Sequence, residues 1–152
     1  MRRTDGWRAL PRGTPVLVWL LLLAAWPPES IRAQQVGSTA SRFVSAWARE
    51  DVGGLQSLMT SVVRLDVEGA GHLGVPPRQA AATLARLFDR YVPAEPETVR
   101  LRDGDGAGEG GFAEFRWVPV TVDTGETVPY VIFVAFRPVG PDLLIAELRV
   151  LR

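Results

Sequence analysis

Cysteine and lysine are absent from the 152 residues of this chain, and histidine occurs once, as His72. A chain without cysteine forms no disulfide and has no thiolate to serve as a nucleophile or as a metal ligand. With a single histidine, the sequence also indicates no nucleophile–base pair for acyl transfer. The fold must therefore be stabilised by burial of an apolar core, which a chain of this size can form.

A long hydrophobic run is also absent. The apolar stretch at residues 16–26 follows four arginines and is ended by two prolines. A membrane-spanning helix needs about 20 apolar residues, so this stretch is too short for a stable span. A basic start, a short apolar run and a small residue (Ala33) before Gln34 are typical of a secretory signal peptide. We expect residues 1–33 to be that signal and residues 34–152 to be exported, either periplasmic or secreted; an uncleaved anchor is the alternative.

Excess positive charge is absent from the expected mature part. Residues 34–152 contain 12 arginines and 15 acidic residues, a net charge of −3. Proteins that bind nucleic acid carry a basic face. The composition therefore predicts no nucleic-acid partner.

A glycine-rich stretch at residues 103–111 partly resembles a calcium-binding loop. Asp103, Asp105, Gly108 and Glu114 fall at loop positions 1, 3, 6 and 12, but Ala107 stands at position 5 and offers no ligand. No helices are expected on either side. We interpret the stretch as a flexible connection and predict no metal and no cofactor.

Hydrophobic periodicity predicts two helices, a strand, a third helix and then four more strands. Ala40, Phe43 and Trp47 recur on one helical face after Ser38, which is a plausible N-cap. Asp51 is expected to cap a short second helix, and Pro77 to begin a third. Strands are expected near residues 62–68, 99–102, 112–122, 127–137 and 143–151, with a loop at residues 69–77.

The alternation in residues 112–136 predicts a hairpin that turns at Thr124 and Gly125, so that the numbers of paired residues sum to 249. One face, here called the inner face, would be apolar and aromatic and would lie against the helices. It contains Ala113, Phe115, Trp117, Val128, Tyr130, Ile132, Val134 and Phe136. The outer face is apolar only near the turn. There, Val118, Val120, Val131 and Phe133 form a patch, here called the outer patch, through which the chain could form a homodimer.

Two registers are open for the last strand. A five-residue loop at residues 138–142 places Leu144, Ala146, Leu148 and Val150 on the inner face. A four-residue loop instead places Glu147 beside Ile132 and Arg149 beside Tyr130. Because burial of unpaired charge is costly, the first register is favoured. The second would indicate a polar site inside the sheet.

This organisation resembles the nuclear transport factor 2-like superfamily, which includes SnoaL-like cyclases, and it is most similar to an exported bacterial domain of unknown function. The segments that carry the resemblance are FVSAWAREDVGGLQSLM, RQAAATLARLFDRY and IAELRVLR. The resemblance implies an α+β, cone-like fold in which three N-terminal helices pack on a curved, mostly antiparallel sheet. It also implies an apolar pocket in the cone, with Trp47, Phe115, Trp117 and Tyr130 as its ligand-binding walls.

Enzymes of that superfamily use Asp, His or Tyr inside the cone for proton transfer. Here His72 lies in a glycine-rich loop, and Asp66 and Glu68 share with Arg64 the polar face of their strand, which is expected to be solvated. Tyr130 could stabilise an oxyanion but is also expected as a core aromatic residue. We therefore predict no catalytic residue and favour a noncatalytic exported domain that binds a small apolar ligand or a protein partner. An acid–base isomerase, dehydratase or cyclase acting on a small hydrophobic substrate is the alternative.

Overall fold

The computed structural model describes residues 28–104 and 110–152. Its main element is a six-stranded sheet. The strand order is β2-β1-β8-β7-β5-β4, and neighbouring strands are antiparallel except for the parallel pair β1 and β8. The strands are β1 (Met59–Val67), β2 (Ala70–Val75), β4 (Glu97–Arg102), β5 (Phe112–Trp117), β7 (Tyr130–Val139) and β8 (Asp142–Leu151). Two short strands, β3 (Tyr91–Val92) and β6 (Val120–Thr121), pair with each other in a second sheet.

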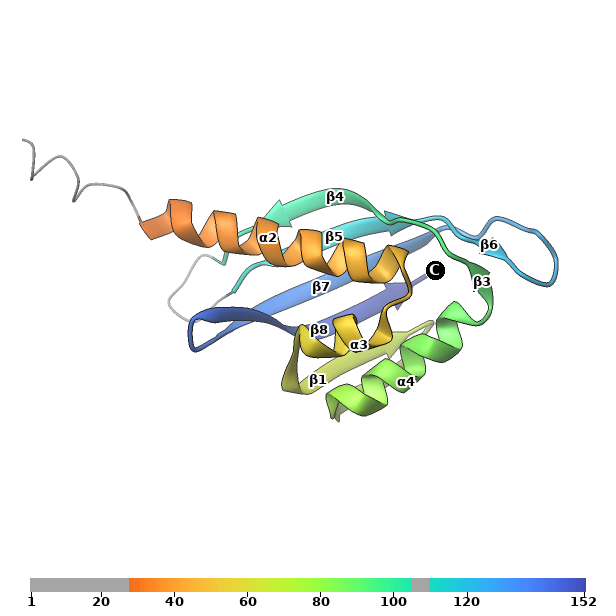
Figure 1. Ribbon diagram of the computed structural model, residues 1–152, viewed down its shortest axis with the longest axis horizontal. Helices are drawn as coiled ribbons and strands as arrows, with labels where there is room; N and C mark the ends of the chain where they lie inside the picture. The colour runs from red at the N-terminus through yellow and green to blue at the C-terminus, as the bar shows by residue number, and fades with distance from the viewer. Residues whose placement is uncertain (1–27, 105–109) are drawn as a thin grey trace, which may run out of the picture.

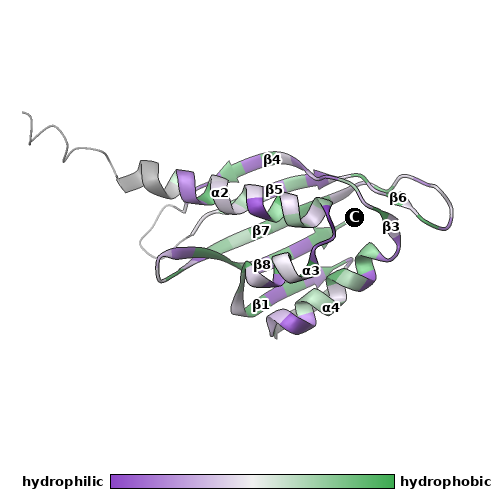
Figure 2. Cartoon of the chain, viewed as in Figure 1, coloured by the Kyte–Doolittle hydropathy of each residue, from purple (hydrophilic) through white to green (hydrophobic). Residues whose placement is uncertain are grey.

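Helices α2 (Pro28–Ala48), α3 (Val52–Ser57) and α4 (Pro77–Phe88) lie on one face of the sheet (Figure 1). Asp51 caps α3 as expected, because its Oδ1 accepts a hydrogen bond from the Gly54 amide at 2.8 Å. Pro77 begins α4, also as expected. Hydrophobic and hydrophilic residues alternate along these helices, and hydrophobic residues run along the strands beneath them (Figure 2). The described helices include none that is both long and apolar enough to cross a membrane.

The prediction that Ser38 caps the first helix was wrong, because α2 already begins at Pro28. Val36 and Thr39 are buried against the core, with 2% and 4% of their surface exposed. Tertiary packing thus extends the helix past Gly37, whose intrinsic helix propensity is poor. Residues 1–27 of the expected signal peptide lie outside the described residues, as do residues 105–109 of the glycine-rich connection.

The two faces of the β5–β7 pair are as predicted, but their register differs by two residues. Trp117 pairs with Tyr130 and Ala113 with Val134, so the paired numbers sum to 247. A shift of two residues leaves each side chain on its expected face. The turn before β7 is a four-residue loop at residues 122–125, in which Gly125 has φ +70°. Pro119 and Pro129 flank this turn and have no backbone N–H, so they cannot donate a hydrogen bond to a neighbouring strand.

The favoured register of β8 was wrong, because Val139 pairs with Asp142 across a two-residue turn instead of a five-residue loop. Leu148 and Val150 nevertheless lie on the inner face as predicted. Leu148 pairs with Val134 and Val150 with Ile132, and all four side chains are buried. A β-bulge at Ala146 then shifts the register, so that Ile145 is buried in place of Ala146. The alternative register is wrong, because Glu147 lies on the outer face.

Strand β2 occupies most of the segment that was expected to be a loop, so that prediction was wrong. Val67 pairs with Ala70 across a two-residue turn, in which Glu68 has φ +55° and Gly69 has φ +83°. Two successive positive φ values are the geometry of a type I′ hairpin. Glu-Gly is a weaker turn signal than Asn-Gly, which explains why the sequence did not reveal the hairpin.

Candidate functional site

An aromatic cluster fills the space between the helices and the sheet. Trp117 is its centre: its ring centroid lies 5.3 Å from Trp47, 5.3 Å from Tyr91 and 5.4 Å from Tyr130. Phe43 stacks on Phe115 at 5.1 Å. The four residues predicted as pocket walls therefore lie together, with Trp47 on α2 and Phe115, Trp117 and Tyr130 on the inner face of the sheet. Each has at most 1% of its surface exposed, so in this structure they pack on one another as core.

A polar network closes one end of this cluster. The hydroxyl oxygens of Tyr91 and Tyr130 are 2.5 Å apart, and the Tyr130 hydroxyl donates to Oε1 of Glu68. Because the Tyr130 proton is committed to Glu68, Tyr91 must be the donor to Tyr130. The Arg90 guanidinium binds the second oxygen of Glu68 at 2.6 Å. The network thus joins the ends of β1, α4, β3 and β7.

The turn between β1 and β2 places Glu68 in this network. Strand alternation predicts its side chain on the outer face with Arg64. The left-handed backbone at Glu68 turns the carboxylate towards Tyr130 instead. Glu68 is exposed, as predicted, but the contact of its carboxylate with Tyr130 was missed, and the missed signal is the type I′ turn.

The pKa values of Tyr130 and Glu68 are shifted in opposite directions. Burial raises the pKa of Tyr130 well above the usual range, and hydrogen bonds to the Glu68 carboxylate and to Tyr91 raise it further. Burial alone would raise the pKa of Glu68, but hydrogen bonds from Tyr130 and Arg90, together with the charges of Arg90 and Arg152, outweigh it. The pKa of Glu68 therefore lies below its ordinary value of 4.5. Near neutral pH, Tyr130 keeps its proton and Glu68 stays ionised.

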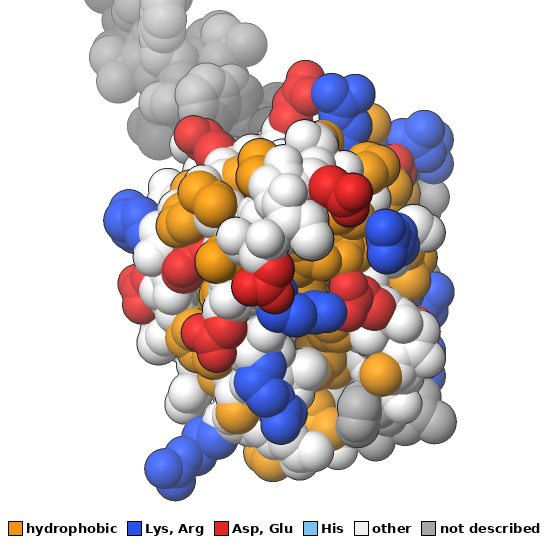
Figure 3. All heavy atoms as spheres, turned by 90° about the vertical axis from the view of Figure 1, so that its right-hand side faces the viewer, with side chains coloured by type: hydrophobic (Ala, Val, Ile, Leu, Met, Phe, Trp, Pro, Cys, Tyr) orange, Lys and Arg blue, Asp and Glu red, His pale blue; other side chains and the backbone are white. Residues whose placement is uncertain are grey.

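A surface hollow of about 610 Å³ lies beside the network, lined by Glu68, Gly69, Arg90, Leu151 and Arg152. This end of the molecule carries the C-terminus, and it faces the viewer in Figure 3. Acidic and arginine side chains are interspersed there with exposed apolar atoms. The hollow therefore offers both charges and an apolar surface to a ligand or a partner.

Glu147 and Asp66, which were also weighed for proton transfer, do not join the network. Glu147 lies on the outer face, where it binds Arg149 at 2.5 Å and Arg64 at 3.8 Å. Asp66 lies on the same face of β1 as Arg64, and its Oδ1 is buried without a hydrogen bond from the described residues. His72 lies in β2 opposite Leu65, and its side chain is outside the described part of the structure.

One polar atom in the aromatic cluster has no partner among the described residues. It is the Nε1–H group of Trp47, on a side chain that is 1% exposed. Trp117 differs, because its Nε1 donates to the carbonyl oxygen of Ala94 at 3.1 Å. Since buried donors are normally paired, the unpaired indole of Trp47 is the one polar group that the described part of the cluster offers to a ligand in the cone.

In the outer patch, Val131 and Phe133 lie on the face of β7 opposite the helices, Val118 follows β5, and Val120 lies in β6 of the second sheet. Val118, Val120 and Val131 have 36%, 37% and 44% of their surface exposed, and Phe133 is half-buried. The described residues contain no group of three or more His, Cys, Asp or Glu side chains that could hold a metal ion.

No protein-family profile and no curated protein matches the sequence. Solved structures do match. A DUF4783 family protein from Bacteroides uniformis is 14% identical with a TM-score of 0.58, over 74% of this chain and 94% of that one. A ketosteroid isomerase-like protein from Erwinia carotovora atroseptica is 14% identical with a TM-score of 0.63, over 78% and 93%.

A protein named as a dehydratase from the NTF2-like family, from Streptomyces avermitilis, is 15% identical with a TM-score of 0.64, over 80% of this chain and 97% of that one. Identities this low establish a shared fold and carry no activity with them. The chain has the nuclear transport factor 2-like fold, in common with these isomerase-like and dehydratase-like proteins and with a domain of unknown function, as the sequence patterns predicted.

Proposed function

We propose that residues 34–152 form an exported, noncatalytic domain that binds a small apolar ligand or a protein partner through its cone. The observation that carries this proposal is the closed network of Tyr91, Tyr130, Glu68 and Arg90. A raised pKa makes Tyr130 a weak acid, and a lowered pKa makes Glu68 a weak base. Acid–base catalysis is most effective when the pKa lies near the working pH, and neither group meets that condition.

The proposed ligand lies among Trp47, Phe115, Trp117 and Tyr130 and accepts a hydrogen bond from the Trp47 indole. Because these side chains are packed on one another, the ligand must displace part of the cluster. The network at Glu68 lies beside the 610 Å³ hollow and is the proposed way in. A small apolar molecule with a single acceptor, such as a ketone, suits this interior.

NMR of the indole N–H groups tests this proposal. Titration with camphor or cyclohexanone should shift the Trp47 resonance, and Trp47→Phe should weaken binding about three- to tenfold because it removes one buried hydrogen bond. Phe43→Leu is the matched control, since it changes the same cluster without removing a donor. If neither ketone moves the Trp47 resonance at saturating concentration, the cone does not bind such ligands.

The alternative is an acid–base isomerase, dehydratase or cyclase, and one observation favours it. Tyr130 and Glu68 share a hydrogen bond beside a hollow, and both have shifted pKa values, a pattern that is enriched at catalytic sites. Such an enzyme would abstract a proton next to a carbonyl group. Exchange of the α-protons of cyclohexanone in D₂O, followed by NMR, would support the alternative if the protein accelerates it and Glu68→Gln abolishes the acceleration.

We also propose that the outer patch mediates a homodimer. A bare sheet face with exposed Val118, Val120 and Val131 favours association with a second copy. Val120→Glu should convert dimer to monomer in sedimentation velocity, whereas Val99→Glu, at an exposed position of β4, should leave the dimer intact. A wild-type chain that sediments as a monomer at tens of micromolar would contradict this part of the proposal.

Export is proposed from the sequence, and its test is direct. Expression in a Gram-negative host followed by N-terminal sequencing should give a chain that begins at Gln34. Cleavage there would shorten α2, which begins at Pro28, but would leave Val36 and the later core residues in place. A chain that keeps its first 33 residues would support the uncleaved anchor instead.

A further inference from the structure

The sheet face opposite the helices carries a hollow of about 620 Å³ that is separate from the network at Glu68. A continuous row of cross-strand neighbours runs across it, formed by Arg64, Glu147, Ala135, Phe112 and Arg102. Neighbouring side chains in such a row stand about 5 Å apart. The small Ala135 in the middle therefore leaves space between larger side chains, and Ala146 at the β-bulge adds to it.

The hollow has a flat aromatic wall. The rings of Phe112 and Phe133 lie 5.3 Å apart at an interplanar angle of 32°, and both side chains are half-buried. Half-buried aromatic side chains on an exposed sheet face leave apolar surface in contact with water. A ligand with a flat apolar body would cover this surface and be stabilised by stacking.

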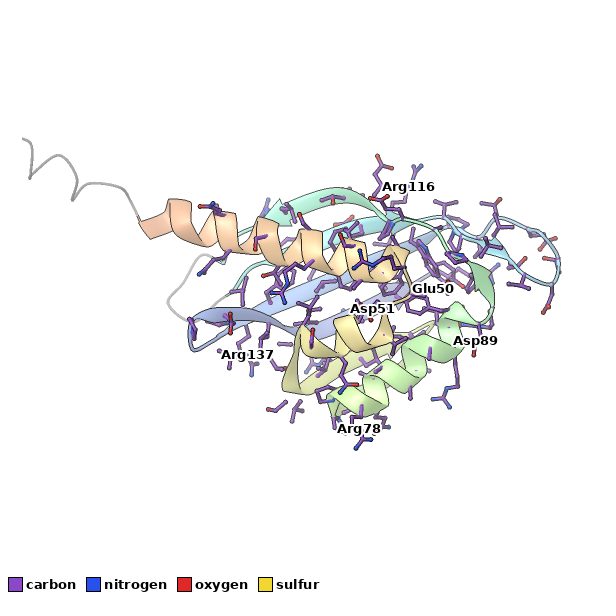
Figure 4. The ribbon with its side chains drawn as sticks, in the orientation of Figure 1. Glu50, Asp51, Arg78, Asp89, Arg116 and Arg137 are labelled. Atoms are coloured by element: carbon purple, nitrogen blue, oxygen red, sulfur yellow. The ribbon has the colours of Figure 1, made fainter. Side chains whose placement is uncertain are left out.

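The rim of the hollow is rich in guanidinium groups. It contains Arg64, Arg102 and Arg137 against two acids, Asp103 and Glu147. Glu147 is already bound by Arg149 at 2.5 Å and by Arg64 at 3.8 Å. The guanidinium groups of Arg102 and Arg137 make no hydrogen bond or ion pair with the described residues. In Figure 4, Arg137 lies towards the β7–β8 turn, far from Glu50 and Asp89 at the other end of the helices.

We propose that this hollow is a second binding site, for a small organic carboxylate with a flat apolar body. The body lies on Ala135 and Ala146 against the Phe112–Phe133 pair, and the carboxylate accepts hydrogen bonds from Arg102 and Arg137. The planar guanidinium matches a carboxylate in shape and charge, which favours an acid over an amine or a neutral amide. The volume of the hollow is within the range of small-molecule sites.

Calorimetric titration of the full chain with 2-naphthoate tests the charge requirement. We expect saturable binding that weakens as salt is raised, because the guanidinium groups are exposed to solvent. The matched probe, 2-naphthamide, has the same shape without the charge and should bind at least about tenfold more weakly. Equal binding of the two probes, or no binding of 2-naphthoate at millimolar concentration, would overturn the proposal.

Two pairs of variants test the location. Ala135→Leu fills the hollow and should abolish binding of 2-naphthoate, whereas Val139→Leu, at an exposed position of the same strand outside the hollow, should not. Arg102→Gln should weaken binding about three- to tenfold, and Arg100→Gln, two positions along β4 and outside the hollow, should have no effect. Circular dichroism verifies that each variant is folded. If Ala135→Leu does not fold, the comparison of Arg102→Gln with Arg100→Gln tests the location alone. Equal affinities of these two variants for 2-naphthoate would overturn the proposal.

Discussion

At the scale of single residues, Glu68 determines the character of the candidate site. Its φ of +55° turns a strand-end carboxylate from the outer face to the hydroxyl of Tyr130. Arg90 then neutralises its charge at 2.6 Å. Because hydrogen bonds to a partly buried charged group are stronger than those between neutral groups, this contact should be visible in stability measurements.

Glu68→Gln should lower the free energy of unfolding by about 1–3 kcal/mol, because it removes the ion pair with Arg90 and weakens the hydrogen bond from Tyr130. Urea unfolding at pH 7 measures this loss. Glu95→Gln is the control, since Glu95 is exposed and makes no ion pair within the described residues. Equal stabilities of the two variants would show that the network is of little energetic consequence.

The same carboxylate should make stability depend on pH in the acid range. The pKa of Glu68 in the folded chain is below 4.5, its ordinary value, so the unfolded chain binds the proton more readily. The stabilisation that ionised Glu68 adds to the folded state is complete above pH 4.5 and is lost as the pH falls through the lower pKa of the folded chain. Unfolding curves from pH 6 down to pH 3 should therefore show a steeper loss for the wild type than for Glu68→Gln. Parallel curves would contradict the lowered pKa.

At the scale of elements, two glycines let the chain cross β7 closely before β5 begins. A Cβ atom at Gly111 would lie 2.3 Å from the carbonyl oxygen of Arg102, and Gly111 has φ +92°. A Cβ atom at Gly110 would lie 2.4 Å from the carbonyl oxygen of Phe136. The glycine-rich composition that suggested only a flexible connection therefore also serves close backbone packing.

Gly111→Ala should destabilise the domain by more than about 2 kcal/mol, because backbone atoms must move to admit the methyl group. Gly53→Ala is the matched control within α3, where the nearest atom to a new Cβ is 3.6 Å away. That variant should be neutral or more stable by up to about 1 kcal/mol. Thermal unfolding of both variants measures the difference, and similar midpoints would refute the close-packing account.

At the scale of the whole molecule, the sequence predicted the architecture better than the site. Alternation in residues 112–136 assigned both sheet faces, because a two-residue error in register does not move a side chain to the other face. The Tyr91–Tyr130–Glu68–Arg90 network could not be predicted, because it joins three separate parts of the chain, at Glu68, at Arg90 with Tyr91, and at Tyr130, and depends on one left-handed residue. The sequence likewise did not predict the β-bulge at Ala146 in β8, since the bulge depends on the tight β7–β8 turn.

The central claim is that Glu68 is an ionised structural partner of Tyr130 and not a general base. The ¹³C chemical shift of the Glu68 side-chain carboxyl, followed against pH by NMR, tests this claim most directly. The account predicts a midpoint below 4.5. A midpoint near about 6 to 7 would contradict it, because Glu68 could then exchange protons near neutral pH and the acid–base enzyme would become the better explanation.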